Sequence, residues 1–195
     1  MTFIVQTVRA YLPEKSSSAT EEKNRIAVLT LAVSIFLPFY FSLAVVSFIA
    51  LMTMIQYRIR VKAFSAPYTK LLFVFLAASF FVAAIYNNYR GMAYSILIYA
   101  AVTCGLYLRS VMTRSLFNEA MDLACVGSIW CAATAVFQKA YYFASSPAYR
   151  PVSVFTNANY YGMIIEFVIL IALYRIFTNP DHLTFYTVVI SVNFI

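Results

Sequence analysis

Long apolar segments, separated by short polar ones, organise this chain. The apolar runs cover about residues 26–57, 69–86, 92–108, 119–139, 154–175 and 183–195. A helix of about 20 apolar residues crosses a bilayer, so most of these runs match the length of a membrane helix. The pattern therefore predicts an all-α fold, a polytopic transmembrane helix bundle over residues 26–195.

The first run, residues 26–57, carries no formal charge and is too long for a single span. One helix over it would reach about 48 Å, against a hydrocarbon core of about 30 Å. The alternative is two short helices, about 26–38 and 40–57, which turn near Pro38.

The distribution of basic residues decides between one helix and two. With two helices, 11 of the 14 basic residues lie on one side of the membrane and 3 on the other, whereas one helix gives 7 and 7. The minority of three comprises Arg90, Lys139 and Arg150. Basic residues concentrate on the cytoplasmic side. We therefore expect about six complete spans plus an incomplete seventh, a cytoplasmic N-terminus, and Arg150 on the outer face.

Composition supports a membrane protein. Hydrophobic residues make up 63% of the chain and charged residues 11%, whereas soluble domains carry about 25% charge. The net charge of +7 fits membrane orientation, so we predict membrane lipid and no nucleic acid as a partner. The expected location is the plasma membrane, as a multi-pass protein.

Cysteine and histidine give no metal-binding pattern. Cys104, Cys125 and Cys131 lie in apolar runs without CxxC spacing, and His182 is the only histidine. The cysteines are interpreted as small packing residues. We predict no metal and no cofactor.

Residues 1–25 differ from the rest of the chain. A short apolar patch precedes the polar run PEKSSSATEEKNR, which is not the pattern of a secretory signal. The segment is expected to be a cytoplasmic surface helix followed by a tether.

The stretch from Arg150 to Arg175 carries the candidate chemistry. Pro151 forces Arg150 into an extended conformation and suits a helix start, where Ser153, Thr156 or Asn157 could act as the N-cap. Arg150 would then stand beside the positive end of a helix dipole, and both attract an anion such as phosphate. The alternative is an interfacial arginine bound to lipid headgroups.

Other residues of this region allow two interpretations each. Tyr149 belongs to a loop rich in aromatic residues, which either anchors the membrane surface or stacks on sugar rings. Asn157 and Asn159 lie near the outer surface and could bind a polar ligand. Glu166 interrupts the middle of the apolar run, where a carboxylate is costly. It is either functional or a neutral acid bonded to a neighbouring helix through one of three amides, those of Gln56, Asn87 and Gln138.

Two further patterns have structural explanations. Ala158 and Gly162 form a small-xxx-small pair that would let a neighbouring helix backbone approach closely. Glu119 and Asp122 are expected to favour the amino end of their own helix.

The run RPVSVFTNANYYG resembles the signature of the O-antigen ligase/polymerase family. In that signature an arginine precedes a Ser/Thr/Gly–Phe segment, an Asn-Pro-Asn-like triplet, an aromatic residue and a glycine. The matching positions are Arg150, Ser153, Phe155, Asn157, Asn159, Tyr160 and Gly162. Ala158 stands where proline is usual, and the match covers only this short segment.

The resemblance implies a metal-independent glycosyltransferase at the outer face of the membrane. Its members transfer saccharide from undecaprenyl diphosphate to a sugar acceptor, and other polysaccharide-assembly proteins are implied as partners. Arg150 is the implied catalytic residue, because a guanidinium can neutralise the departing diphosphate. The candidate substrate-binding residues are Tyr149, Asn157, Asn159, Tyr160 and Glu166.

The chain departs from the family in ways that limit this implication. The resemblance implies a histidine base in a long outer loop, whereas this chain is predicted to have no long outer loop and its His182 is predicted to be cytoplasmic. The expectation is therefore an incomplete, inactive amino-terminal portion of such a protein. Two other classes remain open. One is a small-solute or ion transporter with Glu166 as its proton site, and the other is a structural membrane subunit.

Overall fold

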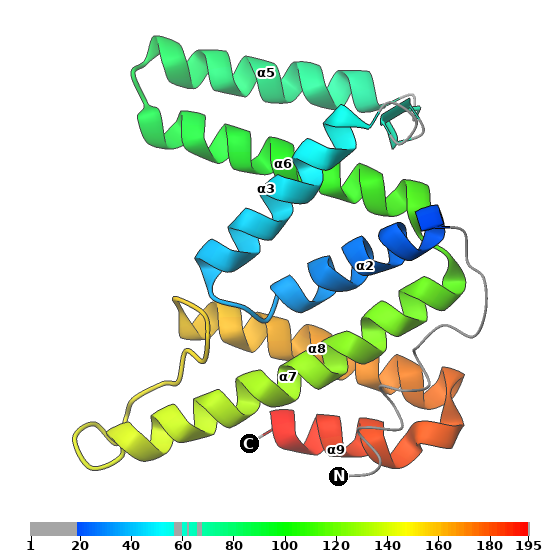
Figure 1. The fold of residues 1–195 in the computed structure, drawn as a ribbon. Coiled ribbons are helices and arrows are strands. Elements are labelled where there is room, and N and C mark those ends of the chain that lie inside the picture. The colour runs from blue at the N-terminus through cyan, green and yellow to red at the C-terminus, as the bar shows by residue number, and fades with distance from the viewer. Residues whose placement is uncertain (1–18, 57–59, 62, 66–67, 195) are drawn as a thin grey trace. The chain divides into compact units, whose positions relative to one another are not determined.

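The computed structural model describes residues 19–56, 60, 61, 63–65 and 68–194. Its regular elements are helices, and none of these residues forms a strand. The elements are α2 (Ala19–Ser34), α3 (Phe39–Ile55), α5 (Thr69–Ile85), α6 (Tyr89–Val111), α7 (Arg114–Tyr142), α8 (Ala158–Thr178), η1 (Pro180–His182) and α9 (Leu183–Asn193) (Figure 1). The prediction of an all-α fold is confirmed. Of the surface segment predicted for residues 1–25, residues 1–18 lie outside the described residues, and residues 19–25 form the first part of α2.

The chain divides into two compact units. Unit 1 combines Met1–Phe39 with Thr113–Ile195, and unit 2 is Tyr40–Met112. The helices α2, α7, α8 and α9 therefore belong to unit 1, and α3, α5 and α6 to unit 2.

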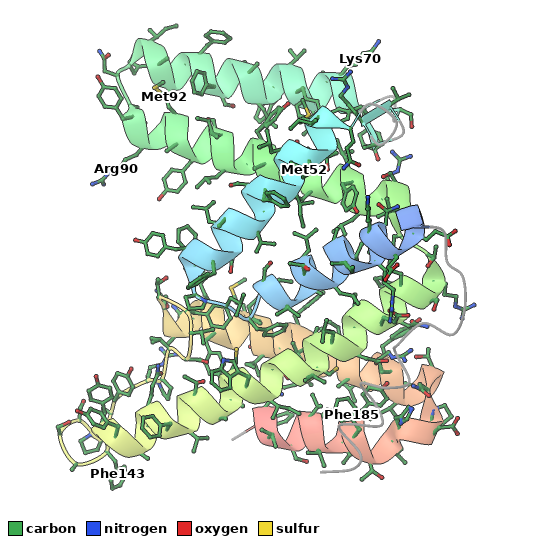
Figure 2. All side chains as sticks on the ribbon, in the orientation of Figure 1. Met52, Lys70, Arg90, Met92, Phe143 and Phe185 are labelled. Carbon is green, nitrogen blue, oxygen red and sulfur yellow. The ribbon has the colours of Figure 1, made fainter. Side chains whose placement is uncertain are left out.

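Unit 2 is built on an antiparallel pair, α5 and α6. Lys70 at the beginning of α5 and Arg90 at the beginning of α6 lie at opposite ends of this pair (Figure 2). The third helix, α3, is tied to α6 by the Cys104 thiol, which donates to the Val46 carbonyl at 3.2 Å.

The described part of the first apolar run, residues 26–56, contains two helices, α2, which already begins at Ala19, and α3. The chain turns between Ser34 and Phe39, at Pro38, as the charge distribution favours. The turn between α2 and α3 shortens both helices, and α3 has only 17 residues. The helix α5 has the same length. Such a helix reaches about 26 Å, less than the hydrocarbon thickness of about 30 Å.

Three helices of the described chain are long and apolar enough to cross a membrane. They are α6, α7 and α8. The expected six complete spans are therefore not reached, because turns and short helices occupy much of the remaining apolar sequence. Large apolar side chains nevertheless cover the outside of the helices, among them Leu71, Phe81, Phe137 and Phe177. Surfaces of this kind suit contact with lipid or other apolar partners.

Unit 1 is organised around α7. This helix contacts α2, α8 and α9, and α8 also contacts α9. Its core gathers Phe36, Cys125, Cys131, Val168, Ala172 and Val189. All three cysteines are buried, Cys104 in unit 2, as expected of packing residues. Gly127 lets the Phe36 ring approach α7, because a Cβ at this position would lie 2.5 Å from a ring carbon of Phe36.

A buried charge network joins three helices of unit 1. Asp122 of α7 accepts hydrogen bonds from Nε and Nη2 of Arg175 of α8, at 2.7 and 2.9 Å. The Tyr186 hydroxyl of α9 donates to the same carboxylate at 2.7 Å. The ionic side chains are only 5% and 7% exposed. Bidentate geometry and a third donor satisfy both charges, as burial requires.

The acids of α7 thus differ from expectation. The helix begins at Arg114, which leaves Glu119 and Asp122 beyond its first turn. Glu119 pairs with Arg25 at 2.7 Å and Asp122 with Arg175. Ion pairing across helices, which sequence spacing does not reveal, explains both acids.

Breaking this network from one side should destabilise unit 1. Asp122→Leu and Arg175→Met each leave an unpaired buried charge and should each lower the free energy of unfolding by about 3–5 kcal/mol. The double substitution should cost less than either single one, since it removes both charges. Unfolding in detergent, followed by circular dichroism, measures all three. A double variant as unstable as the sum of the singles would contradict this account.

Candidate anion-binding cavity

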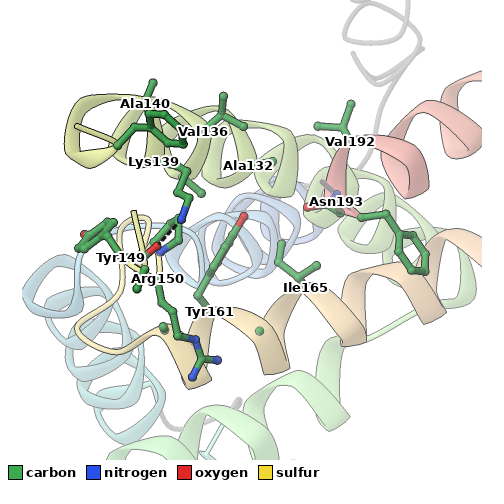
Figure 3. Close-up of a pocket in the computed structure, with 17 residues that line it drawn as sticks. Ala132, Val136, Lys139, Ala140, Tyr149, Arg150, Tyr161, Ile165, Val192 and Asn193 are labelled. Atoms are coloured by element: carbon green, nitrogen blue, oxygen red, sulfur yellow. Dashed lines mark hydrogen bonds between the residues drawn. The ribbon is translucent and has the colours of Figure 1, made fainter. Parts of the chain in front are cut away.

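A cavity opens beside the loop that joins α7 to α8. Its volume is about 730 Å³, within the range of small-molecule sites. The walls come from the second half of α7, the loop, the first turns of α8 and the end of α9 (Figure 3). The cavity lies entirely within unit 1.

Two cations stand at the loop end of this cavity. Lys139 of α7 and Arg150 of the loop both line it, and none of the lining residues is acidic. Within the part of the chain that the structure describes, the Arg150 guanidinium has no hydrogen bond or ion pair. Its side chain extends away from the Lys139 amine in Figure 3. The cavity mouth therefore carries uncompensated positive charge.

Lys139 also holds the first half of the loop. Its ammonium donates to the backbone carbonyls of Pro147 at 2.7 Å and Tyr149 at 2.9 Å. An ammonium has three N–H donors, so one donor of Lys139 remains unused. Its positive charge is also not neutralised, because both acceptors are uncharged carbonyls. Lys139 can thus fix the residue before Arg150 and still contribute charge to the cavity.

Gln138 holds the second half of the loop. Its Oε1 accepts from the backbone N–H groups of Val152 and Ser153, at 3.1 and 2.9 Å, and its Nε2 donates to the Ser153 carbonyl at 2.8 Å. Ser153 has a left-handed φ of 54°, and its hydroxyl donates to the Cys131 carbonyl at 2.7 Å. A non-glycine residue keeps such a φ only when its surroundings hold it there.

The beginning of α8 has the N-cap that the sequence allows. The Asn157 side chain accepts from the Asn159 backbone N–H at 2.7 Å, so Asn157 is the cap among the three candidates. Ser153 instead anchors the loop to α7. The loop conformation delays the helix to Ala158, later than the predicted start near residue 154.

The structure brings two of the six predicted site residues to the cavity. Tyr149 and Arg150 line it, whereas Asn157, Asn159 and Tyr160 are exposed and do not. The Phe155 ring of the same sequence run packs against the core and lies 6.1 Å from the Tyr161 ring.

Glu166 also lies outside the cavity. Its side chain is exposed, beside the exposed Met163 and Phe167. It has no hydrogen bond or ion pair among the described residues. Gln138, one of the amides suggested as its partner, binds the loop instead.

Ala158 and Gly162 line the cavity. In the described structure a Cβ added at Gly162 meets no atom within 4 Å, so no neighbouring backbone approaches it there. The expected close helix packing at this pair is therefore wrong. The small side chains leave open space beside α8.

The sequence did not single out Gln138, Lys139 or Tyr161 as site residues. Gln138 and Lys139 follow one another near the end of α7, where polar side chains in an apolar run could have indicated a bound loop. Tyr161 lies one position beyond the expected Tyr160, on the side of α8 that faces the cavity. Only the register of the helix distinguishes these two tyrosines.

The far end of the cavity is mostly apolar. Ile165 of α8 and Val192 and Phe194 at the end of α9 line it, together with the Asn193 amide. A cationic mouth and an apolar floor suit an amphiphile with an anionic head. No family model, curated protein or solved structure matches this chain.

Filling the open space beside α8 should block the cavity. Gly162→Leu adds a side chain where nothing lies within 4 Å, so the fold should persist. Binding of farnesyl diphosphate, an amphiphilic anion, should weaken at least about tenfold, or 1.4 kcal/mol. Calorimetric titration in detergent measures this. Gly105→Leu is the matched control, since Gly105 of α6 is also open and lies in unit 2. Equal binding by both variants would contradict the assignment of the cavity.

Proposed function

We propose that the cavity binds the diphosphate of a polyprenyl-diphosphate-linked saccharide at the outer face of the plasma membrane. The protein would belong to the machinery of cell-envelope polysaccharide biosynthesis, as an O-antigen ligase/polymerase-type glycosyltransferase or its donor-binding portion. The observation that carries the proposal is the uncompensated Arg150 guanidinium at the mouth of a cavity that also contains Lys139 and no acid.

Charge explains how this site would act. Cleavage of the bond between sugar and diphosphate leaves negative charge on the diphosphate. Arg150 can bind a phosphate through two parallel hydrogen bonds and remains charged at any physiological pH. Lys139 adds a second positive charge from α7. Stabilising the charge that develops on a leaving group often accounts for much of an enzyme's rate acceleration.

The lining residues also define what the site lacks. Neither histidine nor a carboxylate lines the cavity, so neither of these two kinds of general base faces it from the described residues. The proposal therefore assigns donor binding and leaving-group stabilisation to this chain. Activation of the acceptor hydroxyl would have to come from elsewhere.

The proposed topology follows from charge and helix order. We place the beginning of α2 in the cytoplasm, with α2, α3 and α5 as tilted or membrane-thinning spans in addition to α6, α7 and α8. The loop between α7 and α8 then faces outward with Arg150. In this topology the ion pairs Arg25–Glu119 and Asp122–Arg175 would lie toward the cytoplasm.

Arg150→Ala should weaken binding of farnesyl diphosphate about 10- to 100-fold, because a charge-assisted bidentate pair is lost. Arg150→Lys should bind with intermediate affinity. Arg90→Ala is the control, since Arg90 is an exposed arginine of unit 2 with the same proposed sidedness. Farnesol, which has no phosphate, should bind all variants alike. Undiminished diphosphate binding by Arg150→Ala would remove Arg150 from the proposed mechanism.

A further inference from the structure

The loop that carries Arg150 is held on both sides by side chains of α7. Lys139 bonds the carbonyls just before Arg150, and Gln138 bonds the backbone just after it. The backbone thus has fixed points at Tyr149 and Val152, with only Arg150 and Pro151 between them. The Pro151 ring further restricts this short segment.

Gln138 contributes more backbone bonds to this loop than any other side chain in the described structure. Its single amide satisfies three backbone groups, two N–H donors and one carbonyl. It also fixes Ser153, which has a left-handed φ of 54°. Without the amide, the loop would lose three bonds, while Ser153 would keep its hydroxyl bond to Cys131.

We propose that Gln138 is a positioning residue, whose side-chain amide sets where the Arg150 guanidinium stands at the cavity mouth. This inference rests on the proposed function of Arg150. Gln138 does not line the cavity and acts through the loop backbone. Its loss lowers the fraction of molecules in which Arg150 is correctly placed, and apparent affinity falls by that fraction.

Gln138→Met tests the proposal, because it keeps the length of the side chain and removes all three hydrogen bonds. Affinity for farnesyl diphosphate falls about tenfold or more, as expected for several lost bonds. Binding of farnesol is unchanged. Inorganic diphosphate, tested in parallel, shows whether Gln138→Met weakens binding of the headgroup without the prenyl chain. Gln56→Met is the matched control, an identical change at an exposed glutamine of unit 2.

Hydrogen exchange separates positioning from general destabilisation. In Gln138→Met, protection is lost at the amides of Val152 and Ser153, while α7 and α8 keep theirs. An equal loss throughout unit 1 would overturn the positioning role in favour of a general structural one.

Gln138→Glu provides a second variant if Gln138→Met does not fold. A protonated carboxyl accepts with one oxygen and donates with the other, as the amide does, whereas a carboxylate cannot donate to the Ser153 carbonyl. The ratio of variant to wild-type affinity therefore rises as pH falls from about 7.5 to about 5. The wild-type chain at each pH corrects for titration of the ligand, and the charged and titratable groups around the loop, Lys139, Tyr149, Arg150 and Tyr161, are the same in both chains. A flat ratio contradicts the proposal.

The outcomes distinguish this inference from the proposed function. Loss of binding in both Arg150→Ala and Gln138→Met supports both. Loss in Arg150→Ala with wild-type binding in Gln138→Met overturns only the role of Gln138. Wild-type binding by Arg150→Ala, or no binding by the wild-type chain, overturns the proposed function itself.

Discussion

The site depends on hydrogen bonds from side chains of α7 to the backbone polar groups of the loop between α7 and α8. Irregular backbone beside a membrane must find hydrogen-bond partners inside the protein or in water. Here α7 supplies them through consecutive side chains, Gln138 and Lys139. The same bonds give the loop a defined shape, and that shape brings Arg150 to the cavity.

Arg175 and Arg150, both in unit 1, differ in how their positive charge is compensated. Arg175 is buried, and a carboxylate and two hydroxyl-bearing side chains surround its guanidinium. Such a group is structural, because nothing of its charge is left for a ligand. Arg150 is exposed at a cavity whose lining contains no acid. The contrast in electrostatic compensation separates the structural cation from the candidate functional one.

Much of the fold follows from the apolar pattern, because membrane helices are long and their sequence signal is strong. The helix break at Pro38 and the N-cap at Asn157 could also be predicted from the sequence, since both depend on local chemistry. The Asp122–Arg175 pair was not, because its partners lie 53 residues apart. Of the site, Arg150 and Tyr149 could be predicted from the sequence. Lys139, Gln138 and the choice of Tyr161 over Tyr160 could not, since they depend on loop conformation and helix register.

The most direct test is an experimental density map of the chain with farnesyl diphosphate bound. Our account predicts diphosphate density in the cavity, in contact with the guanidinium of Arg150 and near the ammonium of Lys139, with the prenyl chain directed toward Ile165. Diphosphate bound elsewhere, or an Arg150 side chain turned away from an occupied cavity, would contradict it.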